Sequence, residues 1–192
     1  MKVLTLDKCH YLTHIPDVSC LPNLEKFSFG NCHSLITIHN SVGCLNKLEI
    51  LRAWDCIKLE SFPPLRLSSL KELELNDCGR LKSFPELLCK MTNIKEIELC
   101  DTFIGELPFS FQNLTDLRCL KISSKNFKIL PECLSECHHL WRLDLDNCYS
   151  LEEIRGIPPN LDHFSAVDCD SLNSSSRRML LSQVCVFFCT SI

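Results

Sequence analysis

Apolar residues recur along this chain in one spaced phrase, which is clearest in residues 70–85, LKELELNDCGRLKSFP. By position, this phrase is L-x-x-L-x-L-x-x-C-x-x-L-x-x-F-P. The alternation of Leu73 and Leu75 predicts a short strand with one buried face, because successive strand side chains point to opposite sides. The later apolar residues come at every third position, which is typical of a turn-rich return path. The phrase therefore predicts one strand followed by one return segment.

The same phrase recurs along the whole chain, and its copies begin at Met1, Leu24, Leu48, Leu70, Ile94, Leu117, Leu140 and Leu161. Successive copies are 21–24 residues apart, within the range of about 20–29 residues that is typical of leucine-rich repeats. One copy cannot bury its apolar edge alone, so the copies are expected to stack and to share one continuous core.

The predicted fold class is therefore an α/β leucine-rich-repeat solenoid, or horseshoe. About eight short parallel strands should line the concave face, in a sheet on the order of 35 Å long. Turns and 3₁₀ segments should form the convex face. Proline suits that return side because it costs no ladder hydrogen bond there. Five repeats have a proline after their last apolar position: Pro16, Pro63, Pro85, Pro108 and Pro131.

We expect three segments along the chain. The solenoid should occupy residues 1–172, and a capping segment should occupy 173–183, with a helix over 177–183 behind the polar run Asn173–Ser176. The hydrophobic residues 184–192 match no repeat position and receive no assignment. Met1 already occupies the first apolar position of a repeat with no polar cap before it, so the chain is expected to be a piece or a truncated relative of a longer protein.

Composition narrows the possible environments and partners. The 192 residues are 45% hydrophobic and carry a net charge of −4, which supports a sizeable core and favours neither nucleic acid nor a membrane as partner. No apolar signal segment follows Met1, so a reducing, intracellular location is expected in spite of 15 cysteines.

Six of the cysteines occupy the ninth position of a repeat, namely Cys9, Cys32, Cys56, Cys78, Cys148 and Cys169. The two remaining repeats have Thr102 and Lys125 at this position. Cysteine is small, readily buried and a weak donor, so these side chains are expected to point inward as free thiols. Their parallel Cβ vectors disfavour disulfides between neighbouring repeats.

One cluster is compatible with a metal or an enzyme site. Cys133, Cys137, His138 and His139 are of the residue types that bind zinc. However, no second half-site at zinc-finger spacing exists, and no phosphate-binding loop or hydrolase motif is present. We expect neither metal, cofactor nor catalysis, and keep an enzyme or zinc protein as one alternative.

Strand side chains that point away from the core are the candidates for binding. They occupy the third, fifth, seventh and eighth positions of each repeat. The candidate residues are Arg52, Trp54, Asp55, Glu72, Glu74, Asp77, Glu96, Glu98, Asp101, Lys121, Arg142, Asp144 and Asp146. An acidic strip flanked by Trp and Arg suits protein docking. Within the repeat at 70–85, Glu72, Glu74, Asn76 and Asp77 are not needed by the core and should carry any specificity.

The phrases LKELELNDCGRLKSFP and IKEIELCDTFIGELP, together with the closing NLDHFSAVDCDSLNSSSRRMLLSQ, are similar to one family. They resemble the leucine-rich-repeat domain of plant TIR-type nucleotide-binding disease-resistance proteins. The resemblance implies a domain that senses a pathogen effector, directly or through a guarded host protein. It also implies contact with the receptor's own nucleotide-binding domain, which helps to keep that switch off.

The resemblance further implies a cytoplasmic or nucleo-cytoplasmic location. ATP binding and NAD cleavage are not carried over, because this sequence lacks the regions that perform them. The expected function is thus a non-catalytic protein-recognition module. One alternative is an extracellular receptor ectodomain, which the N-glycosylation acceptor sequons at Asn113 and Asn173 would suit. Another is a nonfunctional fragment.

Overall fold

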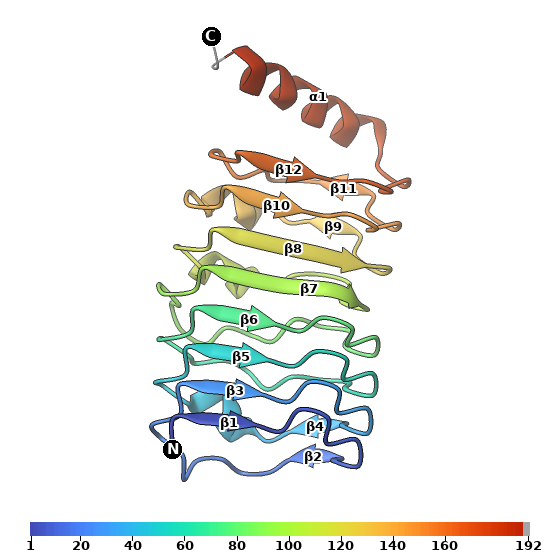
Figure 1. Ribbon diagram of the computed structural model, residues 1–192. Coiled ribbons are helices and arrows are strands. Elements are labelled where there is room, and N and C mark those ends of the chain that lie inside the picture. Colours follow the sequence, from blue (N-terminus) through green and yellow to red (C-terminus); the bar gives the residue numbers. More distant parts are fainter. Residues whose placement is uncertain (190–192) are drawn as a thin grey trace.

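Eight parallel strands lie one above the other and form the front of the molecule (Figure 1). The computed structural model describes the backbone of residues 1–189 and the side chains of residues 1–181. The strands of the main sheet, in spatial order, are β1 (Val3–Thr5), β3 (Lys26–Ser28), β5 (Ile50–Arg52), β6 (Glu72–Glu74), β7 (Glu96–Thr102), β8 (Cys119–Ser124), β10 (Arg142–Asp144) and β12 (His163–Ser165). The predicted parallel solenoid is confirmed.

The register of this sheet follows the repeat numbering. The third position of each repeat lies beside the third position of the next, as in Ile50 beside Glu72 and Glu72 beside Glu96. The fourth position does the same, as in Leu73 beside Ile97, and both of these side chains are buried. A period of two therefore sends one row of side chains into the core and the next row to the outer face.

The return paths carry short structures of their own. Two small parallel sheets pair β2 (His14–Ile15) with β4 (Thr37–Ile38), and β9 (Ile129–Leu130) with β11 (Glu153–Ile154). Short 3₁₀ helices form η1 (Asn40–Cys44), η2 (Phe109–Asn113) and η3 (Glu132–Glu136). The predicted 3₁₀ segments of the convex side are thus confirmed. Pro108 and Pro131 precede η2 and η3 in extended conformation, where proline is well tolerated.

The eighth position of the repeat bends the chain at the end of each strand. Seven of the eight repeats have a left-handed residue there, with φ between 53° and 64°. These residues are Lys8, Asn31, Asp55, Asp77, Asp101, Asn147 and Asp168. Asn and Asp tolerate this conformation better than other residues with a Cβ. This role of the eighth position was not predicted from the sequence.

The ninth-position cysteines bridge neighbouring repeats. The Sγ atoms of Cys56 and Cys78 lie 3.1 and 3.0 Å from the sixth-position carbonyls of Phe29 and Ala53 in the preceding repeats. Cys32, Cys148 and Cys169 contact the corresponding carbonyls in the same way. Every cysteine up to Cys169 is a free thiol. The prediction is wrong for Cys9, which is exposed because no preceding repeat of this chain covers it.

Repeats five and six depart from this arrangement. Thr102 is buried at the ninth position of repeat five, and its strand partner is Ser124, at the eighth position of repeat six. Ser124 donates to the carbonyl of Ile104 in the preceding repeat at 2.7 Å, and the Thr102 hydroxyl donates to the sixth-position carbonyl of its own repeat, Leu99, at 3.2 Å. Lys125, the ninth residue of repeat six by sequence count, is exposed, and Ser124 takes the buried place because the pairing has shifted by one residue.

The last repeat ends in helix α1 (Ser174–Cys189). Asn173 Oδ1 accepts the backbone N–H of Ser176 at 2.8 Å, as an N-cap residue does. Ser176 is buried, and its Oγ accepts the N–H of Ile154 at 2.9 Å, which fixes the helix start to the return path. The helix begins before the expected 177 and continues into the unassigned 184–192 segment. Residues 190–192 lie outside the described part.

Candidate functional site

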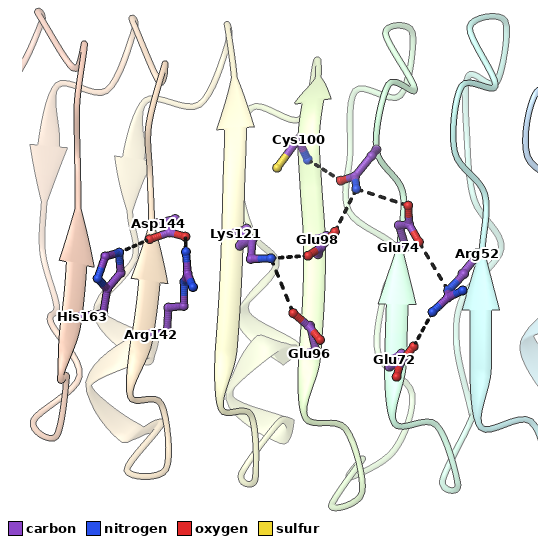
Figure 2. Close-up of polar contacts among 11 residues, drawn as sticks. Arg52, Glu72, Glu74, Glu96, Glu98, Cys100, Lys121, Arg142, Asp144 and His163 are labelled. Carbon is purple, nitrogen blue, oxygen red and sulfur yellow. Dashed lines mark hydrogen bonds and ion pairs between the residues drawn. The ribbon is translucent and has the colours of Figure 1, made fainter.

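Four carboxylates occupy the centre of the strand face, on β6 and β7 (Figure 2). On one side, Arg52 from β5 binds both glutamates of β6. Its Nη2 lies 3.0 Å from Glu72 Oε2, and its Nε lies 3.4 Å from Glu74 Oε2. On the other side, Lys121 from β8 binds both glutamates of β7. Its Nζ donates to Glu98 Oε1 and lies 3.6 Å from Glu96 Oε1.

Asn76 joins the two halves of this network. Its Nδ2 donates to Glu98 Oε2 at 3.0 Å and to Glu74 Oε1 at 3.4 Å. Its Oδ1 accepts the backbone N–H of Cys100 at 2.8 Å (Figure 2). The expectation that Asn76 is not needed by the fold is therefore wrong. We call this group the acidic network, comprising Arg52, Glu72, Glu74, Asn76, Glu96, Glu98 and Lys121.

The pKa values of the two central carboxylates, Glu74 and Glu98, are shifted in opposite directions. Burial raises the pKa of Glu74, and the nearby Glu98 charge adds to the effect, while Arg52 opposes it. Burial acts in the same direction on Glu98, but hydrogen bonds from Lys121 and Asn76 outweigh it and lower its pKa. Both side chains are less exposed, at 28% and 24%, than Glu72 and Glu96, at 39% and 42%.

A small hollow of about 100 Å³ opens between these groups, lined by Arg52, Glu72, Leu73, Glu74, Glu96 and Glu98. Four carboxylates and two cations leave the acidic network with an excess of negative charge. A charged ammonium or guanidinium group of a partner would find carboxylate acceptors around this hollow.

A second charged group lies beside the first on β10 and β12. Arg142 donates from Nε and Nη2 to Asp144 Oδ2, at 2.9 and 2.8 Å. His163 Nε2 lies 2.9 Å from the other oxygen, Asp144 Oδ1, without the alignment of a hydrogen bond (Figure 2). His163 was not predicted as a site residue, although its third position in the last repeat places it in the same row as Arg142.

Seventh-position side chains connect one repeat to the next. Asp146 Oδ1 accepts the N–H of Val167 at 2.8 Å and the hydroxyl of Ser165 at 2.5 Å. Asp7 makes the same contacts to the second repeat, and Asn76 makes the backbone contact to the fifth. Asp146 therefore has a structural role that was not predicted from its outward position in the repeat.

Trp54, also at a seventh position, covers the preceding repeat. A Cβ at Gly30 would come within 2.2 Å of the Trp54 ring, a distance that real Cβ atoms do not tolerate. The ring therefore lies directly over Gly30 and remains half-buried on the strand face.

The remaining candidates, Asp55, Asp77 and Asp101, occupy the left-handed eighth position. Their residue type has a backbone explanation independent of any partner. Asp55 Oδ2 additionally lies 2.9 Å from Nε2 of His33, whose ring is 5.0 Å from that of His10. The acidic network thus contains six of the thirteen predicted residues, and the other seven are not part of it.

The alternative cluster on the return path does not converge. Cys137 is buried, and burial raises the pKa of its thiol to about 12, with Cys133 adding to the effect. His138 and His139 are exposed and lie 3.9 Å from Glu136 and Asp116, respectively. Within the described residues, no three His, Cys, Asp or Glu side chains are placed to hold a metal ion together.

No helix in the described part of the chain combines the length and the apolar character needed to cross a membrane.

Comparison with known proteins identifies the type of repeat. Residues 66–126 match the family model of leucine-rich repeats in RPS4B-like disease-resistance proteins. The chain is 32% identical over 159 residues to TMV resistance protein N of Nicotiana glutinosa, covering 82% of this chain and 14% of that protein. It is 34% identical over 195 residues to disease resistance protein RPP4 of Arabidopsis thaliana, covering 90% of this chain and 17% of that protein.

A solved structure supports the same fold. The leucine-rich repeat domain of the type III effector XopL superposes with a TM-score of 0.78 and 26% identity, covering 88% of this chain and 61% of that chain. The predicted resemblance to the repeats of plant disease-resistance proteins is thus confirmed, and this fold is typically a protein-interaction module. The chain spans less than a fifth of the length of the two plant relatives.

Proposed function

Since the leucine-rich repeats of this chain are of the plant disease-resistance type, we propose that it is a non-catalytic protein-recognition module of an intracellular plant immune receptor. In this proposal the strand face recognises a pathogen effector or a guarded host protein. The module also contacts the nucleotide-binding domain of the receptor and restrains its switch. It acts in the cytoplasm, or in cytoplasm and nucleus, and uses no cofactor.

The acidic network is the observation that supports recognition most directly. Its charged ends point away from the core, and Arg52 and Lys121 hold its carboxylates in place before any partner arrives. Preorganised charges lose little freedom on binding, and the hollow between them suits a basic side chain of a partner. Trp54 offers a neighbouring aromatic surface, of the kind enriched at binding hot spots.

The test uses neutral variants because charge reversal would disturb the fold. Glu98 contacts Lys121 and Asn76, so a lysine at this position would face another lysine and lose both hydrogen bonds. Glutamine retains the size of glutamate and part of its hydrogen bonding. The face variant therefore replaces four residues by glutamine: Glu72, Glu74, Glu96 and Glu98. The matched control replaces three exposed carboxylates of the return path, Glu86, Glu106 and Glu136.

Both variants and the wild type are expressed with an affinity tag in pathogen-challenged leaves of the source plant, and captured proteins are quantified by mass spectrometry. We expect the face variant to lose a specific protein partner by about tenfold, which corresponds to about 1.4 kcal/mol, while the control retains it. Equal capture by the face variant, folded as judged by circular dichroism, would argue against recognition through the acidic network.

A further inference from the structure

Two adjoining hollows lie at the ends of strands β7 and β8 and along the loops that follow the strands. The first has a volume of about 360 Å³ and is lined by Phe103, Lys125 and Tyr149, among others. The second has a volume of about 650 Å³ and includes Lys82 in its lining. Both hollows are lined by Gly79 and Phe103, so they adjoin at these two residues and are treated together. We call them the edge groove.

Gly79 keeps this groove open without any structural need for glycine. Its φ is not positive, so the backbone would accept another residue. A Cβ at this position would also have no atom within 4 Å, so crowding does not require glycine either. Any longer side chain at position 79 would project into the free space that the two hollows share.

The apolar part of the groove consists of exposed aromatic rings. Phe103 is 36% exposed and Tyr149 is 46% exposed. Large apolar side chains that remain exposed beside an open space are candidates for contact with a partner's apolar group. Aromatic side chains contribute strongly to such contacts because they bury a large area with few rotatable bonds.

The net charge of the groove lining has the opposite sign to the net charge of the acidic network. Lys82 and Lys125 form no ion pair within the described part of the chain, while Arg80 Nη1 lies 3.7 Å from Glu60 Oε1. The lining cations are Arg80, Lys82 and Lys125, and the lining carboxylates are Glu60 and Asp101. The groove therefore carries a local excess of positive charge in a chain whose net charge is −4.

We propose that the edge groove is a second protein-docking surface, which binds a partner segment with an apolar side chain flanked by carboxylates. The apolar side chain fills the space left by Gly79 and packs against Phe103. The flanking carboxylates pair with Lys82 and Lys125. The lining supplies only one more cation than carboxylate, which favours a segment with a few carboxylates over the many closely spaced phosphates of a nucleic acid.

The test uses three short acetylated, amidated peptides, followed by amide NMR spectra of the full chain. The first peptide has a central phenylalanine with two aspartates on each side, the second replaces the aspartates by lysines, and the third replaces the phenylalanine by alanine. We expect only the first to bind saturably and to shift the resonances of Phe103 and Lys125. The net negative charge of the chain would favour the lysine peptide if binding were unspecific.

Three groove variants and one control identify the site. Gly79→Leu fills the opening and should abolish binding, and Phe103→Ala should weaken it by removing the apolar contact. The double variant Lys82→Glu/Lys125→Glu should lower the affinity about tenfold, because two attractive pairs become repulsive. Lys90→Glu changes an exposed lysine outside the groove and should leave the affinity unchanged.

Four results would overturn the proposal. The first is binding of the aspartate peptide to Gly79→Leu and Phe103→Ala with the affinity of the wild type. The second is binding of the lysine peptide to the wild type as tightly as the aspartate peptide, or more tightly. The third is the absence of saturable binding of the aspartate peptide to the wild type, and the fourth is displacement of that peptide by single-stranded DNA. The outcome of the partner-capture test of the acidic network does not affect the outcome of the peptide test, since the two surfaces share no lining residue.

Discussion

The left-handed backbone at the end of each strand decides which residues fit the eighth position. An aspartate or asparagine adopts a positive φ at modest cost, whereas a β-branched residue does so only with strain. Asp77 has a φ of 58°. This conformational demand is sufficient to account for the recurrence of Asp and Asn at this position.

Substitution of Asp77 tests this backbone explanation. We expect Asp77→Val to destabilise the protein by about 1–3 kcal/mol, because the branched side chain crowds the left-handed backbone. Asp77→Gly and Asp77→Asn should cost much less. Urea unfolding followed by circular dichroism measures the difference. Equal stability of the Val and Gly variants would show that the backbone does not select the residue here.

The buried ninth-position cysteines stabilise the fold, because each fills space in the core and donates one weak hydrogen bond to a backbone carbonyl. Cys78→Ala leaves the Ala53 carbonyl without its S–H donor and opens a small cavity. We expect a loss of about 1–3 kcal/mol of unfolding free energy. Cys9→Ala is the matched control, since Cys9 has the same repeat position but is exposed. A comparable loss in both variants would contradict the role of the carbonyl contact.

At the scale of the elements, the strands and their register could be predicted from the sequence, because the apolar period specifies both. Leu73 and Leu75 alternate with polar residues, and this alternation permits only one face to be buried. The shifted pairing of Thr102 with Ser124 could not be predicted in this way. Small polar side chains fit either register, so the choice depends on contacts across repeats.

The binding face shows the same division between predictable and unpredictable features. The period predicts that Glu72, Glu74, Glu96 and Glu98 share one face. It does not reveal that Asn76 joins Glu74 to Glu98 and supports the backbone of Cys100. Nor does it distinguish a free carboxylate from one that caps the next repeat, because both are polar residues at outward positions.

Substitution of Asp146 tests the contact that a seventh-position side chain makes between the repeats of β10 and β12. Asp146→Ala should remove the acceptor for the Val167 N–H and for Ser165, and destabilise the end of the solenoid by about 1.5–3 kcal/mol. Asp146→Asn should largely preserve it, as Asn76 makes the equivalent backbone contact. Hydrogen exchange of the Val167 amide reports the change locally. The same exchange rate in Asp146→Ala and wild type would refute a capping role.

On the scale of the whole molecule, the solenoid has two faces of different chemistry. The strand face carries the acidic network, and the loops after the strands carry the more basic edge groove. Parallel stacking produces this division, because each repeat position becomes a continuous row along the sheet. Polar side chains at the third and fifth positions are not part of the core, so the binding surface that they form can vary while the fold remains constant.

The acidic network also makes the stability of the molecule depend on pH in two opposing ways. The pKa of Glu98 lies below the ordinary 4.5, so the unfolded chain takes up its proton first, and Glu98 stabilises the fold less as pH falls below 4.5. The pKa of Glu74 lies above 4.5, so the folded chain keeps its proton longer. Its contribution is therefore lost as pH rises above 4.5.

Single glutamine variants should separate these contributions in urea unfolding measured across pH. The stability advantage of the wild type over Glu98→Gln should shrink as pH falls below 4.5. Glu74→Gln should gain stability relative to the wild type as pH rises above 4.5. In a Lys121→Met background the pH effect of Glu98→Gln should diminish, because Lys121 supplies the hydrogen bond that lowers its pKa. Parallel pH trends for both glutamine variants would contradict the opposite pKa shifts of Glu74 and Glu98.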